Sequence, residues 1–172
     1  MVRVLFLICA TALFVATNGC KKSPPPAAPA TASSLPTHAQ PKLQTMKLWL
    51  GAEEMVTELA LTGRQMQTGM MFRTNMAENE AMLFIEPETR QVGHWMMNCP
   101  LPLSIAYISP DGVIREIHDL KPHNTNTVAS ASANIRFALE TPQGWFQRHN
   151  ISTGTVVRTE HGTLEDVFLR RR

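Results

Sequence analysis

The chain has 172 residues, of which 44% are hydrophobic and 17% are charged, and this favours one globular domain with accessory segments. The formal net charge is +2, but residues 45–172 hold 12 Lys and Arg against 14 Asp and Glu, a net charge of −2. That balance predicts no basic surface and argues against nucleic acid as a partner.

The first 20 residues have the pattern of an export signal. Arg3 precedes an apolar run over residues 4–16, which is shorter than the roughly 20 residues that span a bilayer and suits a signal peptide. The run ends at Gly19-Cys20. This ending resembles the processing box of bacterial lipoproteins, in which the cysteine becomes the lipidated first residue of the mature chain. Two alternatives stay open: an ordinary secretory signal and an uncleaved anchor.

Residues 21–44 contain half of the 12 prolines of the chain and almost no large apolar side chains. Such a segment cannot bury enough apolar surface to offset its ordering entropy, so the sequence predicts a disordered tether. Together with a lipidated Cys20, this places the protein in the bacterial cell envelope. We expect it to be anchored to the membrane on the non-cytoplasmic side, at the periplasmic face.

Eight short segments have the alternating or continuous apolar patterns of β-strands. They cover residues 45–50, 55–61, 81–85, 91–97, 104–109, 113–119, 135–139 and 155–158. The turn Pro110-Asp111-Gly112 between two of them predicts the clearest hairpin in the chain. Residues 121–134, rich in Asn, Thr, Ser and Ala, are expected to form a long surface loop.

Two short helices are predicted from their start signals. Thr62 and Gln65 have the spacing of a capping box, in which each side chain binds a free backbone N–H of the first turn. Thr141 as N-cap and Pro142 at the first helical position predict a second helix that ends near Asn150.

These elements predict an α+β fold dominated by β-structure. Successive hairpins favour a compact antiparallel sheet that closes into a small barrel or sandwich, with two short helices. The globular domain is expected over residues 45–160. Residues 161–172, which end in three arginines, are expected to form a solvated C-terminal tail.

Several short motifs follow one another in a fixed order between residues 45 and 158. They are Gly69-Met70-Met71-Phe72-Arg73, Ala81-Met82-Leu83-Phe84, His94-Trp95-Met96-Met97-Asn98-Cys99, Pro102-Leu103-Ser104-Ile105, Asp111-Gly112 and the turn from Ile151 to Gly154. This series resembles domain-of-unknown-function family 192, small β-rich domains of bacteria and archaea that are frequently exported or lipid-anchored. The resemblance implies a compact, mostly β fold with short helices. It implies no established reaction, substrate or cofactor.

The chain departs from the family pattern at several positions. Ser104 stands where the family usually has Asp, Cys99 where it has Thr, His94 where it has Phe or Tyr, and Ala81 where it has Gly. A serine cannot act as a charged base or a metal ligand in place of an aspartate. If members of the family were enzymes that use this aspartate, the present chain would be impaired.

Arg73, His94, Trp95 and Asn98 are the candidate site residues, because they stand among the densest apolar residues of the chain. The planar fork of Arg73 suits an anionic ligand, or it ties backbone carbonyls and an acidic side chain together. Trp95 lines a binding site or belongs to the core. Asn98 contacts a ligand or holds a turn through bonds to the backbone.

No metal site and no cofactor are expected. His94 and Cys99 are five residues apart, as are His118 and His123, and neither pair has the spacing of a zinc site. Cys99 lies beside Pro100 among apolar residues, which favours an inert thiol over a nucleophile.

Two classes of function follow from these observations, beside a purely structural lipoprotein. The first is a non-catalytic binding or interaction domain for an envelope protein, a glycan or a small ligand. The alternative is an enzyme of unrecognised type that uses the neighbourhood of Arg73, His94, Asn98 and Cys99. A dry core around Trp95 would favour binding, whereas a wet cleft in which Arg73 and His94 converge would favour catalysis.

Overall fold

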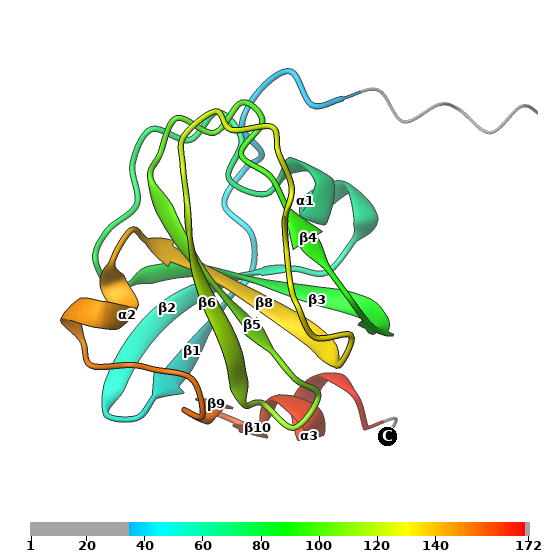
Figure 1. Cartoon of the computed structure of the whole chain (residues 1–172), viewed down its shortest axis with the longest axis vertical. Helices are drawn as coiled ribbons and strands as arrows, with labels where there is room; N and C mark the ends of the chain where they lie inside the picture. Colours follow the sequence, from blue (N-terminus) through cyan, green and yellow to red (C-terminus); the bar gives the residue numbers. More distant parts are fainter. Residues whose placement is uncertain (1–34, 171–172) are drawn as a thin grey trace, which may run out of the picture. The chain divides into compact units, whose positions relative to one another are not determined.

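A computed structural model describes residues 35–170 (Figure 1). The signal segment over residues 1–20 and most of the tether lie outside the described residues. The strands are β1 (Thr45–Leu50), β2 (Glu53–Ala60), β3 (Glu80–Arg90), β4 (Gly93–His94), β5 (Leu103–Ile108), β6 (Ile114–Leu120), β7 (Val128–Ala129), β8 (Ile135–Pro142), β9 (Val157–Thr159) and β10 (Gly162–Thr163). The helices are α1 (Gly63–Thr68), α2 (Trp145–Arg148) and α3 (Leu164–Phe168). In this part of the chain no helix is long and apolar enough to cross a membrane.

Eight strands form one mixed sheet in the order β10-β9-β1-β2-β3-β8-β5-β6, and β4 pairs with β7 in a separate two-stranded sheet. The predicted β-dominated α+β class is thus confirmed. The prediction of a purely antiparallel sheet is wrong, because β2 and β3 run parallel. The reason is the connection: α1 and the loop after it carry the chain back, so that β3 starts at the same end as β2.

The ladder of the large sheet ends at β10 on one side and β6 on the other. Val113, just before β6, and Val156, just before β9, meet at a single bridge. There the Ile114 N–H donates to the Thr155 carbonyl at 2.9 Å. No closed barrel is found among the described residues, so closure into a barrel or sandwich stays a prediction.

The large sheet carries apolar side chains on both faces. In β3, Ala81 and Leu83 belong to one buried cluster, whereas Met82 and Phe84 belong to a second. This alternation follows from the period of two in a strand and explains the continuous apolar run at this point in the sequence. The second cluster also holds residues of the α1 turn and of the segment after β4, and the pocket described below lies in this layer.

The predicted first helix is confirmed, together with its cap. The Thr62 side chain accepts from the Gln65 N–H at 3.2 Å, and the Gln65 side chain accepts from the Thr62 N–H at 3.0 Å. The predicted second helix starts too early. Thr141 and Pro142 extend β8 by pairing with β5, and α2 begins only after Gly144, which has a φ of 72°.

The chain also folds where a C-terminal tail was expected, so there are three short helices in the described residues rather than two. Thr163 and Asp166 form a capping box at the start of α3, and Leu164 is fully buried in the core. The spacing of Thr163 and Asp166 was a readable start signal. The prediction of a tail over residues 161–172 is therefore wrong for residues 162–168.

The last part of the predicted tether lies on the domain. The Leu43 N–H donates to Glu58 Oε2 at 2.7 Å, and Gln40 Nε2 donates to the Gly69 carbonyl at 2.9 Å. Lys42 Nζ lies 2.7 Å from Glu80 Oε1. Residues 40–43 thus contact β2, β3 and the turn after α1, because the domain offers them specific polar partners that composition does not reveal.

Candidate functional site

A small pocket lies in the second apolar layer, between α1, β3, β4 and β8. Its cavity volume is about 40 Å³, which is room for a few water-sized groups, since one water needs about 10–15 Å³. Four polar side chains line it, Gln67, Thr68, His94 and Glu140, together with Phe84 and Trp95. Most of the remaining wall is sulfur-bearing: Met66, Met70, Met71, Met96, Met97 and Cys99.

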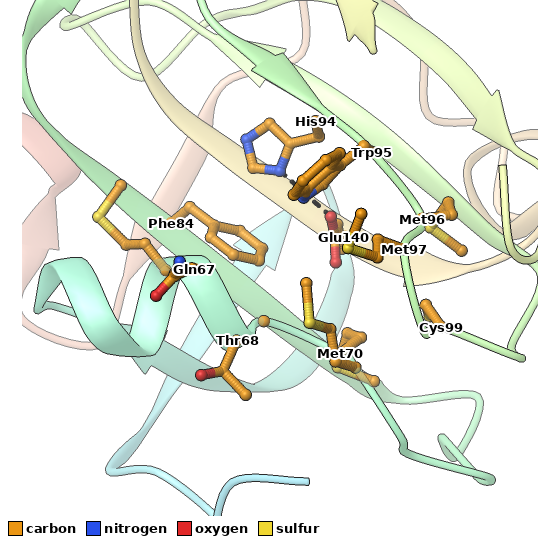
Figure 2. A pocket seen from close by; sticks show the side chains of 13 residues that line it. Gln67, Thr68, Met70, Phe84, His94, Trp95, Met96, Met97, Cys99 and Glu140 are labelled. Atoms are coloured by element: carbon orange, nitrogen blue, oxygen red, sulfur yellow. Dashed lines mark hydrogen bonds and ion pairs between the residues drawn. The ribbon is translucent and has the colours of Figure 1, made fainter. Parts of the chain in front are cut away.

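Glu140 reaches this pocket from the middle of the large sheet. It lies in β8 between Met82 of β3 and Ile105 of β5, on the same face as Ala138. Its side chain is only 5% exposed. Among the described residues, His94 is the one side chain that hydrogen-bonds its carboxylate, through Nδ1 at 3.3 Å from Oε1. Figure 2 shows this contact at the centre of the pocket.

The His94 ring is held on several sides. It packs edge-on against Phe84 with a centroid distance of 4.7 Å, and Tyr107 lies 6.0 Å away. Burial raises the pKa of Tyr107 above its ordinary value, so this residue stays a neutral phenol. Its hydroxyl donates to the carbonyl of Val128, the β7 partner of His94. The imidazole is therefore a fixed group rather than a mobile one.

Two turns bring the methionines together. Gly69 has a φ of 44°, and a Cβ there would lie 3.3 Å from the Phe84 ring. The positive φ and the close approach both favour glycine at this position. The Phe72 N–H then donates to the Asn98 carbonyl at 2.7 Å, which ties the turn after α1 to the turn after His94.

Asn98 contributes its backbone to the site and does not line the pocket. Its φ is 56°, in the left-handed region that asparagine tolerates better than most residues. The interpretation as a turn-holding residue is therefore favoured, although the bond is made by its carbonyl and not by its side chain.

Arg73 lies outside the pocket, and its guanidinium is already paired with a carboxylate. Its two terminal nitrogens bind the two oxygens of Glu58 at 2.7 and 2.8 Å, and the side chains are 12% and 11% exposed. A bidentate carboxylate fills the fork that an anionic ligand would use. The structure thus joins His94 and Trp95 in one pocket, whereas Arg73 takes part in a separate ion pair.

Cys99 lines the pocket as a buried thiol. Burial raises its pKa to about 11, so a thiolate is scarce at neutral pH. Ser104 lies elsewhere: its hydroxyl donates to Asp119 Oδ1 at 2.6 Å and accepts from the Gly144 N–H at 2.8 Å. The serine that replaces the family aspartate therefore supports the start of α2.

Sequence reasoning missed Glu140, which stands in a strand with no motif around it. The methionine pairs 70–71 and 96–97 are visible in the sequence, but their pattern fits core packing as well as a binding site. No group of three or more His, Cys, Asp or Glu side chains is arranged to hold a metal ion within residues 35–170.

These features define a small β-rich domain with a pocket in which His94 meets Glu140. The comparisons agree with the β-rich class. The chain belongs to domain-of-unknown-function family 192 (DUF192, "Uncharacterized ACR"), whose family model matches residues 47–159. No curated protein matches it.

Two solved structures have a similar fold. One is a candidate transcription regulator from Sinorhizobium meliloti 1021, with a TM-score of 0.66 and 31% identity over 70% of this chain and 98% of that one. The other is a protein of unknown function from Novosphingobium aromaticivorans DSM 12444, with a TM-score of 0.66 and 26% identity over 74% of this chain and 94% of that one.

Proposed function

We propose that this chain is a lipid-anchored protein of the bacterial cell envelope whose β-rich domain is a non-catalytic binding module for a small cation. The anchor is the predicted lipid on Cys20, and the membrane is the corresponding partner. The binding function is supported chiefly by Glu140, a buried carboxylate that faces a methionine-rich pocket.

A buried carboxylate is costly unless donors or a cation compensate it. Glu58 has such compensation, because Arg73 and the Leu43 N–H bind both of its oxygens. In the described residues, Glu140 has one partner, His94, at the longer distance of 3.3 Å. A small cation in the pocket would supply the compensation that the protein itself does not.

The pocket also limits the size and charge of its ligand. A cavity of about 40 Å³ excludes ligands of drug size, and Glu140 disfavours anions. Trp95, 40% exposed, stands at the rim, where an aromatic face attracts cations. An envelope protein or a glycan could therefore enter only through a small cationic group.

The test is a thermal-shift screen of the detergent-extracted protein with ammonium, methylammonium, guanidinium, Zn²⁺, Cu(I) and Ag(I). At least one cation should raise the melting temperature, and Glu140→Gln should abolish that shift. Glu86→Gln is the matched control, since Glu86 is equally buried but is bound by Arg90 at 2.7 Å. If none of these cations stabilises the protein, the proposal fails.

Nucleic acid is not proposed as a partner, although one structural relative is described as a candidate transcription regulator. Residues 45–172 carry a net charge of −2, from 12 basic and 14 acidic side chains. Binding to a phosphate backbone relies on clustered Lys and Arg, which this balance does not provide.

The alternative of an enzyme rests on fewer groups than the sequence suggested. Arg73 is bound by Glu58, and the raised pKa of Cys99, about 11, makes it a poor nucleophile. This alternative therefore relies on the His94–Glu140 pair as its acid–base couple. Turnover of any small amine or ester that His94→Gln and Glu140→Gln both abolish would favour this alternative.

A further inference from the structure

We infer that the cation is the soft metal ion Cu(I), held by thioether sulfurs of the methionine pocket with Glu140 as its counter-charge. This inference rests on the proposed function, because it uses the same pocket. Figure 2 shows Met70, Met97 and Trp95 among the side chains drawn around Glu140, and all four residues line the pocket. We assign the two thioethers as metal ligands.

The concentration of methionine is specific to this place. Five of the ten methionines of the chain line the pocket. The other buried cluster of the domain has fifteen buried members, and only one of them, Met55, is a methionine. The rest are mainly leucine, isoleucine, alanine and aromatic residues. Packing alone therefore does not require methionine in this fold, and the pocket differs from the core around it.

Thioethers suit Cu(I) better than they suit an ammonium group. Soft sulfur ligands select Cu(I) over hard cations, whereas an ammonium has three N–H donors, and a thioether is a weak acceptor. The other polar side chains of the wall are engaged: Thr68 donates to the Arg64 carbonyl at 2.8 Å, and Gln67 Oε1 accepts from Arg64 at 3.3 Å. Glu140 alone would leave part of an ammonium unsatisfied.

Charge balance explains why a carboxylate lies among sulfur atoms. Thioethers are neutral, so a bound Cu(I) would keep its positive charge in a buried site. Glu140 supplies the opposite charge, which offsets the cost of burying a cation. His94 positions this carboxylate through its hydrogen bond and is itself fixed by Phe84.

Cys99 also lines the pocket but is a weaker candidate ligand at neutral pH. Metals bind the thiolate form of cysteine, and burial has raised the pKa of this thiol to about 11. A thioether has no proton to lose, so binding by Met70 and Met97 does not compete with protonation of the ligands.

The decisive measurement is Cu(I) affinity of the detergent-extracted protein, under reducing conditions and against a competing chelator. We expect Met70→Leu and Met97→Leu each to lower the affinity by about tenfold or more, the scale seen when the support of a metal site is lost. Leucine replaces methionine with little change in volume, so the fold should persist. Met55→Leu is the matched control, because Met55 is fully buried in the other cluster and does not line the pocket.

A second readout identifies the ligands directly. Ag(I) has the same closed-shell preference for sulfur without redox chemistry, and it should shift the methionine methyl NMR signals of Met70 and Met97 but not of Met55. Cu(I) affinity that survives both leucine substitutions, or that is lost only in Cys99→Ser, would overturn the inference. A Glu140-dependent response to alkylammonium without one to Cu(I) would also overturn it, yet leave the proposed function standing. No response to any cation would overturn both.

Discussion

Glu58 and Glu140 are both buried carboxylates, but their surroundings differ. The difference distinguishes a residue that stabilises the fold from a residue of the candidate site. Glu58 has both oxygens bound, by the Arg73 fork and by the Leu43 N–H. Glu140 has His94 beside one oxygen and the methionine pocket around it. A fully paired group stabilises the fold where it is, whereas an incompletely paired one gains from a ligand.

Arg73 is therefore expected to stabilise the fold rather than to bind a ligand. Arg73→Met leaves Glu58 buried with a single backbone donor, and removing one partner of a buried ion pair costs about 3–5 kcal/mol. We expect a loss of about 3 kcal/mol in the free energy of unfolding, measured by urea denaturation. The double variant Arg73→Met/Glu58→Leu should recover most of it, because no charge then stays unpaired. A single variant as stable as the wild type would contradict this assignment.

Cys99 makes stability fall at high pH. Its pKa is 9.0 ordinarily and about 11 in the folded protein, so above pH 9 the unfolded chain releases a proton that the folded chain keeps. Stability is unaffected below pH 9 and falls as pH rises from 9 to 11, by about 2 kcal/mol at 1.4 kcal/mol per pKa unit. Between pH 9 and 11 the stability of Cys99→Ala should therefore fall by about 2 kcal/mol less than that of the wild type. Equal losses in urea melts at pH 9 and 11 would show that the thiol does not contribute.

Helices and turns were predicted correctly from the sequence where residues close together in the chain determine the local structure. The Thr62–Gln65 capping box and the hairpin around Asp111-Gly112 need only nearby residues, and both are present. The start of the second helix was misplaced because β5 pairs with Thr141 and Pro142, a contact over almost 40 residues that overrides the local signal. The parallel pairing of β2 with β3 has the same origin.

The candidate site was predictable in part for a similar reason. His94 and Trp95 stood in a recognisable motif, and both line the pocket. Glu140 comes from a strand 46 residues further along, and only the register of β8 between β3 and β5 places it there. Arg73 and His94 both stand among the densest apolar residues of the chain, but the Arg73 side chain takes part in the pair with Glu58.

Residues 35–44 are expected to stabilise the domain, contrary to the sequence-based assignment to a tether. A chain that starts at Thr45 loses the bonds from Gln40 to the Gln65 and Gly69 carbonyls and the Leu43 donor to Glu58. With each net hydrogen bond worth about 1 kcal/mol, we expect a loss of about 2–3 kcal/mol. A thermal melt of the shortened chain beside Gln40→Ala measures it, and unchanged melting would restore the tether assignment.

At the scale of the whole molecule, the domain gains no stability from disulfides in its described part, where Cys99 is free and buried. Its stability comes from two apolar layers on the large sheet, from buried ion pairs and from the segment before β1. None of these depends on the redox state of the surroundings. The domain is thus compatible with the oxidising conditions outside the cytoplasm, where disulfides would otherwise be common.

Placement in the envelope depends on Cys20, and the last prediction tests it. If Cys20 is lipidated, intact-mass analysis of membrane-extracted protein should find a chain that begins at residue 20 and carries acyl groups. Two or more acyl chains give stable anchoring where a single chain is marginal, so the protein should fractionate with membranes. Cys20→Ala should lose both the added mass and the mature N-terminus, whereas Cys99→Ala should change neither. An unmodified N-terminus near residue 20 would indicate an ordinary secretory signal, and a chain that keeps residues 1–19 would indicate an uncleaved anchor.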